Sequence, residues 1–362
     1  MGGPAYTVYW LCKAIAKKGI VPTVISTTLG IKEKSQIYKK YHQEKKGEIQ
    51  YIEYGKLSNI KLLFKCIFKL RSVDIIHFSS LFYWPNFFIS FFAVFCEKKI
   101  VWSTRGETSK NALKYGSSLK SIYIYFLKTL IIKKVVFHST CEKETNEIKH
   151  AFGNDIKIIE IPNYIKLKQK VQSSSQDYFL FTGRLHPIKA VDNLIMALSQ
   201  CPLFINSKYT LKIAGDIDGT QDSINFKIKL FKLVEEYNLT HKIEFLGHIQ
   251  NKKDKLYSEA YFLILPSHTE NFGNVVIESL AQGTPVIASK GTPWKILEDK
   301  QAGFWVDNDL ESLINCISEA IELSKTKYEY YRINALELVQ NEFDIDKNIY
   351  KWLDVYEKII RE

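Results

Sequence analysis

The sequence has 362 residues, of which 46% are hydrophobic and 25% are charged, a mixture typical of globular proteins. This composition excludes a largely disordered chain, a collagen-like repeat and a small disulfide-stapled protein, and the length fits about two domains. The formal charge of +11 is unevenly divided. Residues 1–170 carry 29 Lys and Arg against 12 Asp and Glu (+17), whereas residues 171–362 carry 21 against 27 (−6).

The positive first half is expected to meet something anionic. An anionic membrane surface is one candidate, and a set of solvated lysines without a partner is the plain alternative. No nucleic-acid-binding motif accompanies the charge, so nucleic acid is not an expected partner.

The six cysteines are scattered, without a CxxC pair or a Cys/His cluster, and are expected to be free thiols in a reducing compartment. No signal peptide is visible. Residues 78–96 are the most membrane-like stretch, but Pro85, Asn86 and serines interrupt it, which favours a strand end, a loop and a buried helix over a membrane span. The expected location is cytoplasmic, with peripheral contact at the inner face of the cytoplasmic membrane.

Strand and helix patterns alternate along the chain. Strands are predicted at residues 21–26, 49–53, 74–78, 100–104, 135–139, 157–161, 178–182, 210–214, 243–246, 262–265 and 285–288. Helices are predicted at residues 5–18, 58–69, 86–95, 118–132, 142–152, 310–323, 328–342 and 346–360, with further helices between the later strands. Such alternation indicates an α/β fold with doubly wound parallel sheets, and the polar run at 166–176 is typical of a linker. We expect two such domains facing a cleft, with ligands beyond the carboxyl ends of the strands.

The first helix follows Gly2, Gly3 and Pro4 directly, with no strand before it. Either the chain is truncated, which we favour, or the sheet lacks its first strand. Both predict an unpaired slot beside the neighbouring strands, and about ten restored apolar residues would then raise the stability.

Two acids flank the start of a helix after the strand at 262–265. Glu270 lies in the loop, and Glu278 lies about one turn into the helix. Gly273 allows close approach of the backbone to a ligand, and the helix start offers free N–H groups. Each carboxylate could hold a pair of hydroxyls; the alternative is two surface glutamates favoured by the helix dipole.

Two cations follow the strand at 178–182. Arg184 and Lys189 stand in one loop beside Gly183. An Arg fork and a Lys point charge suit a diphosphate and could stabilise a nucleoside-diphosphate leaving group without a metal ion. The alternative is a pair of solvated loop charges.

The ordered set of motifs resembles the retaining nucleotide-sugar glycosyltransferases of family 4, which have the GT-B fold of two Rossmann-like domains. The residues that carry the resemblance run through nearly the whole chain: Gly2-Gly3, Gly183-Arg184-Leu185 with Lys189, Ala214-Gly215, Phe245-Leu246-Gly247, Pro266-Ser267 with Glu270 and Glu278, and Ala281, Gly283 and Pro285-Val286. The stretches 103–107 and 291–294 further resemble members that build bacterial surface polysaccharides such as O-antigen, capsule or exopolysaccharide.

The resemblance implies a role for each matched residue on the donor side. Arg184 and Lys189 would bind the donor diphosphate, and Glu270 would contact the donor sugar as a positioning group rather than a proven nucleophile. Phe272, Gly273 and Asn274 would line that sugar. Glu278 would hold the ribose, and Gly2 and Gly3 would close over the phosphates.

It also implies the domain plan. An acceptor-side domain would span residues 1–168 and a donor-binding domain residues 169–345, with a final helix at 346–362 crossing back to the first. The saccharide or lipid-linked acceptor would lie against the basic first half. No cofactor and no metal ion would be needed, because the nucleotide sugar is a substrate.

Several residues depart from the family pattern or imitate another. Arg105 stands where many members have a histidine; it could meet an anionic acceptor or a donor phosphate, or form a salt bridge with Glu107. His77 could face the cleft, although a buried, hydrogen-bonded histidine is favoured, as for His138. Ala190 replaces a glycine, and the loop-to-helix start is expected to stay intact.

An acidic motif and a tryptophan each allow two interpretations. Asp216-Ile-Asp218 resembles the metal site of the other glycosyltransferase fold, but follows Ala214-Gly215, where this family has an acidic loop without metal. Trp294 could stack on a sugar or pack in the core.

Three other functions stay open. A nucleotide-sugar epimerase of the same two-domain shape would convert the donor without an acceptor. An inactive protein could bind a nucleotide sugar or dock on a membrane. A dinucleotide oxidoreductase is disfavoured, since no complete G-x-G-x-x-G with a following acidic residue is present.

Overall fold

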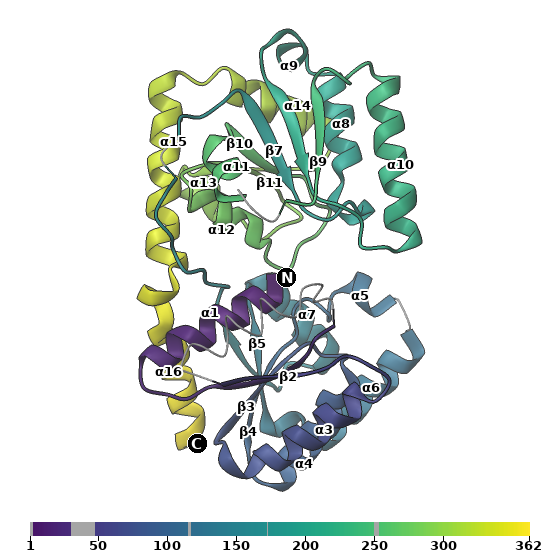
Figure 1. Cartoon of the computed structure of the whole chain (residues 1–362), viewed down its shortest axis with the longest axis vertical. Helices are drawn as coiled ribbons and strands as arrows, with labels where there is room; N and C mark the ends of the chain where they lie inside the picture. Colours follow the sequence, from purple (N-terminus) through teal and green to yellow (C-terminus); the bar gives the residue numbers. More distant parts are fainter. Residues whose placement is uncertain (1–2, 30–47, 115–116, 172, 250–252) are drawn as a thin grey trace. The chain divides into compact units, whose positions relative to one another are not determined.

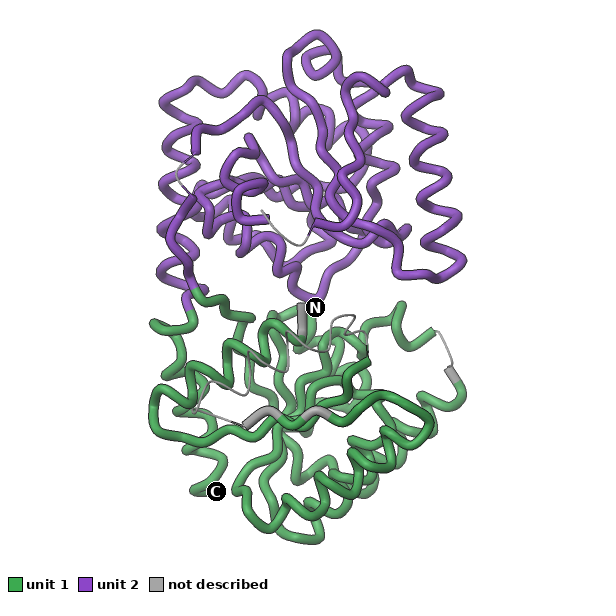
Figure 2. The backbone as a smooth tube through the Cα atoms, viewed as in Figure 1, with its two compact units in different colours: residues 1–166, 345–362 green, residues 167–344 purple. Residues whose placement is uncertain are grey.

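A computed structural model describes residues 3–29, 48–114, 117–171, 173–249 and 253–362. The chain divides into two compact units (Figure 2): unit 1 comprises residues 1–166 and 345–362, and unit 2 comprises residues 167–344. The divisions fall beside the expected boundaries at 168/169 and 345/346. Each unit is described by itself below.

Unit 1 is an α/β unit (Figure 1). Its strands are β1 (Thr23–Thr27), β2 (Glu48–Ile52), β3 (Ile75–Ser79), β4 (Lys99–Ser103), β5 (Val135–Ser139) and β6 (Lys157–Glu160). Its helices are α1 (Gly3–Lys17), α3 (Ser58–Lys69), η1 (Leu70–Ser72), α4 (Trp84–Phe95), α5 (Lys110–Lys114), α6 (Ser117–Leu130), η2 (Ile132–Lys134), α7 (Glu142–Phe152) and α16 (Ile345–Arg361).

The strands of unit 1 form two parallel sheets, one with the order β1-β2 and one with the order β3-β4-β5-β6. Within the described part of the unit, β1 pairs with β2 but with no strand of the larger sheet. The interrupted sheet that the sequence predicts is therefore seen as a division into two sheets.

Apolar side chains cover both faces of the larger sheet. One cluster joins α1 and α16 to β4, through Leu11, Ile15, Val101, Ile349 and Trp352. A second cluster packs α3, α4 and α7 against the opposite face. The last helix of the chain is thus part of the core of unit 1.

Unit 2 contains a single six-stranded parallel sheet with the order β12-β11-β10-β7-β8-β9. Its strands are β7 (Tyr178–Thr182), β8 (Thr210–Ala214), β9 (Ile243–Gly247), β10 (Phe262–Leu265), β11 (Val286–Ser289) and β12 (Gly303–Val306). Its helices are η3 (Pro187–Lys189), α8 (Val191–Ser199), α9 (Pro202–Asn206), α10 (Gln221–Glu236), α11 (Lys253–Glu259), α12 (Asn274–Leu280), α13 (Ile296–Asp299), α14 (Leu310–Ile321), α15 (Lys325–Leu338) and η4 (Val339–Phe343). The predicted parallel α/β architecture is confirmed in both units.

The central strands β7, β10 and β11 are buried along their whole length, because helices cover both faces of a parallel sheet. The edge strand β12 is the one that sequence reasoning missed. It has four residues and begins at Gly303, where a Cβ would lie 1.9 Å from the Val286 carbonyl oxygen. The close pairing with β11, rather than a long β-branched pattern, makes this segment a strand.

The stretch at 78–96 is a strand end, a loop and helix α4, as predicted, but the expectation of a buried helix is wrong. Five aromatic side chains of α4 are exposed, among them Phe95 at 82%. Of the helices that the structure describes, none combines the length and the apolar character needed to cross a membrane.

Candidate functional site

The loops after β7 and β8 lie close together because of two glycines. The Gly183 N–H donates to the Ala214 carbonyl at 3.1 Å, and a Cβ on Gly215 would lie 1.7 Å from the Gly183 carbonyl oxygen. Only glycine fits at 215 without moving the backbone. The two strand ends therefore stand side by side and carry Arg184 at the carboxyl edge of the sheet, where ligands of open α/β sheets bind.

Lys189 and Glu270 meet directly at this edge. The Lys189 ammonium contacts Oε1 of Glu270, and the two side chains are only 16% and 13% exposed. The buried Ser267 hydroxyl donates to the same oxygen at 2.9 Å. Sequence reasoning placed the cation and the acid at one edge but did not foresee their ion pair or the serine that supports it.

Backbone contacts hold these two loops in place. The His268 N–H donates to the Ile188 carbonyl at 2.9 Å, and the Glu270 N–H donates to the Gly291 carbonyl at 3.2 Å. A Cβ on Gly291 would lie 2.3 Å from the His268 carbonyl oxygen. The loop that carries Glu270 is thus fixed from both sides, by η3 and by the loop after β11.

Lys189 is followed by Ala190, which adopts a left-handed conformation at φ 49° and is fully buried. This conformation suits glycine better than alanine. The expected loop-to-helix start is nevertheless intact, since α8 begins at Val191.

The segment from Phe272 to Asn274 leads into α12. Gly273 precedes the helix at φ 82°, in the region that favours glycine. Trp294 is 1% exposed, donates its indole N–H to the Phe272 carbonyl and packs on the rings of Phe272 and Phe343. Of the two alternatives for Trp294, the structure therefore shows packing rather than an open stacking platform.

Glu278 lies within α12, as predicted, and is held by α11. Its Oε2 contacts the Lys253 ammonium and accepts the Tyr257 hydroxyl at 3.0 Å. Burial and the Glu278 charge raise the pKa of Tyr257, so this hydroxyl stays protonated and donates to the carboxylate. The Tyr257 oxygen then accepts the Thr182 hydroxyl at 2.8 Å, which ties Glu278 to the end of β7.

Sequence reasoning missed Lys253 and Tyr257. The available signal was their spacing: four residues apart on a helix, they lie on the same face. A cation and a phenol on the helix just before the strand at 262–265 could have been paired with the acid of the helix just after it.

Arg184 is 65% exposed and contacts Asp218, with 3.0 Å between Nη1 and Oδ2. The Thr220 and Ser223 hydroxyls donate to the other oxygen of Asp218. These hydrogen bonds, with a smaller contribution from Arg184, hold the pKa of Asp218 well below its ordinary value. Asp218 therefore orders the loop before α10 and supports the Arg184 side chain.

Asp216 has a different set of partners. It accepts the Ile217 N–H at 2.8 Å and the Lys227 ammonium at 2.9 Å. Among the residues that the structure describes, no group of three His, Cys, Asp or Glu side chains is arranged to hold a metal ion.

The structure thus places all four predicted side chains of unit 2 in loops and helices at the carboxyl edge of one sheet. Lys189 and Glu270 contact each other. Arg184 and Glu278 instead contact partners that were not predicted, Asp218 and Lys253.

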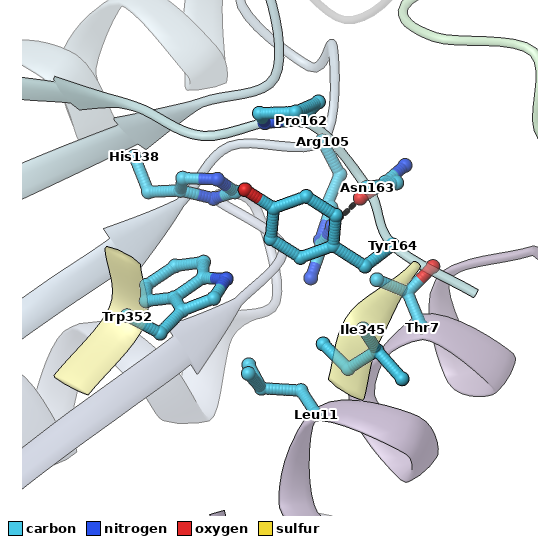
Figure 3. Close-up of a pocket in the computed structure, with 9 residues that line it drawn as sticks. All are labelled: Thr7, Leu11, Arg105, His138, Pro162, Asn163, Tyr164, Ile345 and Trp352. Carbon is cyan, nitrogen blue, oxygen red and sulfur yellow. Dashed lines mark hydrogen bonds between the residues drawn. The ribbon is translucent and has the colours of Figure 1, made fainter. Parts of the chain in front are cut away.

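Arg105 lines a small pocket within unit 1 (Figure 3), together with His138, Asn163, Tyr164 and residues of α1 and α16. Its guanidinium donates to Asn163 at 3.0 Å (dashed in Figure 3) and to Ser79 at 3.3 Å. Its backbone is left-handed at φ 56°, which costs free energy in a residue with a side chain and is typical of functional sites.

The salt bridge between Arg105 and Glu107, one of the alternatives for Arg105, is not among the ion pairs of the described residues. Glu107 accepts the Ser80 hydroxyl and the N–H groups of Leu81 and Phe82, so it orders the loop before α4. A second acid, Glu144, accepts the Gly106 N–H and is 1% exposed. Glu144 therefore holds the loop that carries Arg105, and Glu107 ties this loop to the one before α4.

His77 belongs to a chain of buried and half-buried hydrogen bonds that ends at a carbonyl oxygen. The His138 Nε2 lies 2.8 Å from the Ile161 carbonyl, which can only accept, so Nε2 carries the proton and Nδ1 accepts the Ser103 hydroxyl at 2.7 Å. Ser103 then accepts from His77 Nε2 at 2.7 Å, and His77 Nδ1 accepts the Tyr356 hydroxyl at 2.8 Å.

Both histidines are uncharged. Burial, aided by the Arg105 charge, lowers the pKa of His77 to about 3 and that of His138 well below its ordinary value. The favoured interpretation of each as a hydrogen-bonded interior histidine agrees with the structure, in which His138 is buried and His77 is half-buried. Gly3 begins α1, whereas Gly2 lies outside the described residues.

Comparison with known proteins shows that the second half of the chain is similar to glycosyltransferases. Residues 164–337 match the model of the family described as "Glycosyl transferases group 1". O-antigen chain mannosyltransferase B of Escherichia coli is 29% identical over 157 residues, which are 42% of this chain and 39% of that protein. An uncharacterised glycosyltransferase of Methanocaldococcus jannaschii is 30% identical over 230 residues, 60% of this chain and 58% of that protein. In the first curated relatives, the match spans only 31–39% of their length.

Solved structures resemble the chain over almost its whole length. Sucrose-phosphate synthase from Thermosynechococcus elongatus has a TM-score of 0.78 at 19% identity and covers 99% of this chain and 94% of its own. HepE from Anabaena, solved with UDP and glucose, has a TM-score of 0.75 at 18% identity and covers 98% and 96%. The predicted GT-B fold is confirmed.

Proposed function

We propose that this chain, whose residues 164–337 match the model of the glycosyl transferases of group 1, transfers a sugar from a nucleoside-diphosphate-sugar donor to a saccharide acceptor with retention of configuration. The acceptor is a growing, lipid-linked saccharide of a bacterial surface polysaccharide. The similarity to an E. coli O-antigen mannosyltransferase supports this acceptor class, and an Anabaena neighbour solved with UDP-glucose supports the donor class.

The observation that carries the proposal is the Lys189–Glu270 pair. An ammonium and a carboxylate that are both mostly covered yet lie at the carboxyl edge of the sheet suit a ligand with an anionic part and a hydroxylated part. The donor diphosphate accepts from Lys189 and from the exposed guanidinium of Arg184. Since Lys189 and Ser267 both contact Oε1 of Glu270, Oε2 is the oxygen that binds sugar hydroxyls.

Glu278 holds the ribose hydroxyls. Its carboxylate is oriented by Lys253 and Tyr257, and carboxylate oxygens accept strong hydrogen bonds from hydroxyl donors. The Thr182–Tyr257–Glu278 contacts link the ribose position to the strand end that carries Arg184. Residues at one edge of the sheet would thereby bind both the ribose and the diphosphate of the nucleotide.

Bond cleavage at the anomeric carbon leaves the electron pair and negative charge on the diphosphate. Lys189 and Arg184 stabilise that charge, and one such preorganised donor is worth on the order of 3–4 kcal/mol in comparable oxyanion sites. The acceptor hydroxyl attacks on the face that the leaving group vacates and gives its proton to the departing diphosphate oxygen, and this same-face attack retains the configuration. Glu270, held by Lys189 and Ser267, positions the sugar and stabilises its positive charge.

This leaving-group stabilisation is assigned to cationic side chains rather than to a metal ion. Asp216 and Asp218 have the spacing of a metal motif, but each is engaged by an ammonium or a guanidinium and by neighbouring donors. On the acceptor side, Arg105 and the pocket beside it in unit 1 are the candidate contact for an anionic group of the acceptor.

A thermal-shift screen with UDP, GDP, ADP and dTDP tests the donor site. A nucleotide at 100 times its dissociation constant should add about 2.7 kcal/mol to the stability, and Lys189→Ala should abolish that gain. Lys290→Ala removes an exposed ion pair in the same unit and should leave it unchanged. If no nucleotide stabilises the protein, or Lys189→Ala keeps the full gain, the donor-site assignment fails.

A nucleotide-sugar epimerase is the rival, because it has the same two-domain shape. Incubation of the stabilising nucleotide's sugar conjugate without any acceptor separates the two. Proton NMR would show an epimerised donor for the rival and an unchanged or slowly hydrolysed donor for the transferase. An inactive binding protein would bind the nucleotide but never release it from the conjugate.

A further inference from the structure

Helix α4 presents a stripe of aromatic side chains to solvent. Trp84, Phe88, Phe91, Phe92 and Phe95 are all at least 41% exposed, and their spacing of four, three, one and three residues puts them on one face of the helix. No charged residue occurs between 84 and 95. The opposite face of α4 is packed in the core of unit 1, so these rings are not needed to hold the helix.

Helix α6 repeats this pattern. Leu119, Ile122, Tyr125, Phe126 and Leu130 are all exposed, Leu119 at 78%, and they recur at the three- and four-residue spacing of one helix face. The buried side of the helix again belongs to the core.

Helix α3 adds a third stripe, in which apolar and basic residues alternate. Ile60, Phe64 and Phe68 are exposed at intervals of four residues, and Lys61 and Lys65 stand beside them and are exposed as well. The aliphatic parts of such lysines lie along apolar surface while their ammonium groups stay in a polar layer.

The three helices are neighbours in unit 1 (Figure 1). The Tyr83 hydroxyl donates to Asn59 of α3 at 2.8 Å, which joins α3 to the start of α4. The rings of Phe87 and Tyr123, 5.3 Å apart, join α4 to α6. We call the exposed apolar side chains of α3, α4 and α6 the aromatic face.

The charge of the aromatic face has one sign. Residues 58–72, 84–95 and 117–130 contain five lysines and one arginine and no acidic residue. Isolated exposed apolar residues are ordinary, but three stripes of them on neighbouring helices mark an interaction surface. Aromatic rings on α4 and α6 together with Lys and Arg on α3, η1 and α6 match a surface that is apolar below and anionic above.

From this combination we propose that the aromatic face docks unit 1 on the surface of an anionic lipid bilayer, with the α4 and α6 rings inserted among the acyl chains and the lysines at the lipid phosphates. No helix of the described residues spans a membrane, so the contact is peripheral. This inference stands on unit 1 alone and does not depend on the donor chemistry of unit 2.

Co-sedimentation of the full chain with vesicles tests the proposal. Vesicles of phosphatidylglycerol and phosphatidylcholine should bind the protein at least tenfold more strongly than pure phosphatidylcholine, and added salt should weaken binding. Phe91→Ser/Phe95→Ser should lower the binding constant at least tenfold, and Lys61→Gln/Lys65→Gln should lower it about tenfold or more. All four side chains are exposed, and an unchanged melting temperature confirms that each variant folds.

Matched controls lie on α15 of unit 2. Tyr330→Ser/Ile333→Ser and Lys325→Gln/Lys327→Gln alter side chains that are also exposed and should leave vesicle binding unchanged. Equal binding of the Phe91→Ser/Phe95→Ser variant and the unaltered protein would overturn the proposal, as would equal binding to both vesicle types. So would light scattering that shows a dimer which this variant splits into monomers, because a second copy would then cover the face.

Discussion

The Lys189 ammonium contacts the same oxygen of Glu270 that accepts the Ser267 hydroxyl. The short helix η3 carries the cation, and the loop after β10 carries the acid. The two side chains are thus already paired in the absence of a ligand. Both are largely withdrawn from solvent, so their mutual attraction is stronger than that of an exposed pair. This arrangement predicts how the two residues respond to substitution.

A double-mutant cycle with Lys189→Met and Glu270→Gln should reveal that coupling. Removing one partner leaves the other covered and uncompensated, and we expect a coupling free energy of about 1–3 kcal/mol in urea unfolding. The exposed pair Lys290–Asp307 is the matched control and should give about 0–1 kcal/mol. Equal couplings in the two cycles would show that Lys189 and Glu270 behave as ordinary surface charges.

Gly215→Ala should disrupt the edge of the sheet that carries Arg184. The new Cβ would lie 1.7 Å from the Gly183 carbonyl oxygen, so the β7 and β8 ends must move apart, and we expect a loss of about 2 kcal/mol or more in stability with weaker nucleotide binding. Gly219→Ala is the control, because nothing lies within 4 Å of its Cβ, and only a conformational cost of about 1 kcal/mol is expected there. Urea unfolding that gives the two variants equal stability would contradict this account of Gly215.

Tyr257→Phe should loosen Glu278. The substitution removes the donor to Glu278 and leaves the buried Thr182 hydroxyl without its acceptor, which costs about 1–3 kcal/mol of stability. Nucleotide affinity should fall several-fold because the carboxylate is less well oriented. Tyr330→Phe, at an exposed tyrosine, should change neither quantity. Calorimetric binding and urea unfolding measure both, and an unaffected Tyr257→Phe protein would remove Tyr257 from the site.

Acid should destabilise unit 1 through His77 and His138. An unfolded histidine takes up a proton near pH 6.5, whereas burial and the Arg105 charge hold the pKa of His77 at about 3 and lower that of His138 as well. The unfolded chain therefore binds more protons, and stability present above pH 6.5 is lost as the pH falls. The slope is about 1.4 kcal/mol per pH unit for each histidine.

Urea unfolding between pH 4 and 6 measures this slope. His77→Gln and His138→Gln should each reduce it by about 1.4 kcal/mol per pH unit, whatever their stability at pH 8. His241→Gln, at an exposed position, should leave it unchanged. If all three variants keep the slope of the unaltered protein, the buried histidines do not determine the acid response.

The sequence predicted the elements that depend on local pattern. β7 carries a nearly continuous apolar run and β8 alternates polar and apolar residues, and the predicted bounds of both agree with the structure. The four-residue edge strand β12 escaped notice, because it is defined by pairing with β11 rather than by its own pattern. The exposed rings of α4 were misjudged for a related reason: hydrophobicity reports what a residue prefers, not whether a neighbour covers it.

The same limit of local sequence pattern applies to the candidate site. Glu270, Glu278, Arg184 and Lys189 stand in recognisable motifs, so their place at the sheet edge could be predicted. The partners of these four side chains could not be predicted. Lys253 reaches Glu278 from 25 residues away, and Asp218 reaches Arg184 from the loop after another strand. Such contacts depend on the three-dimensional order of β7, β8 and β10, which one-dimensional spacing leaves undetermined.

The most direct test of the donor site is the rate at which the protein releases nucleoside diphosphate from the matching sugar conjugate, with lipid-linked saccharides from a bacterial extract as acceptor. Lys189→Ala, Arg184→Ala and Glu270→Gln should each lower that rate about 100- to 1,000-fold, as expected when one preorganised electrostatic contact to the transition state is lost. Lys290→Ala should release at the unaltered rate. Unaltered rates in all three site variants would contradict the account.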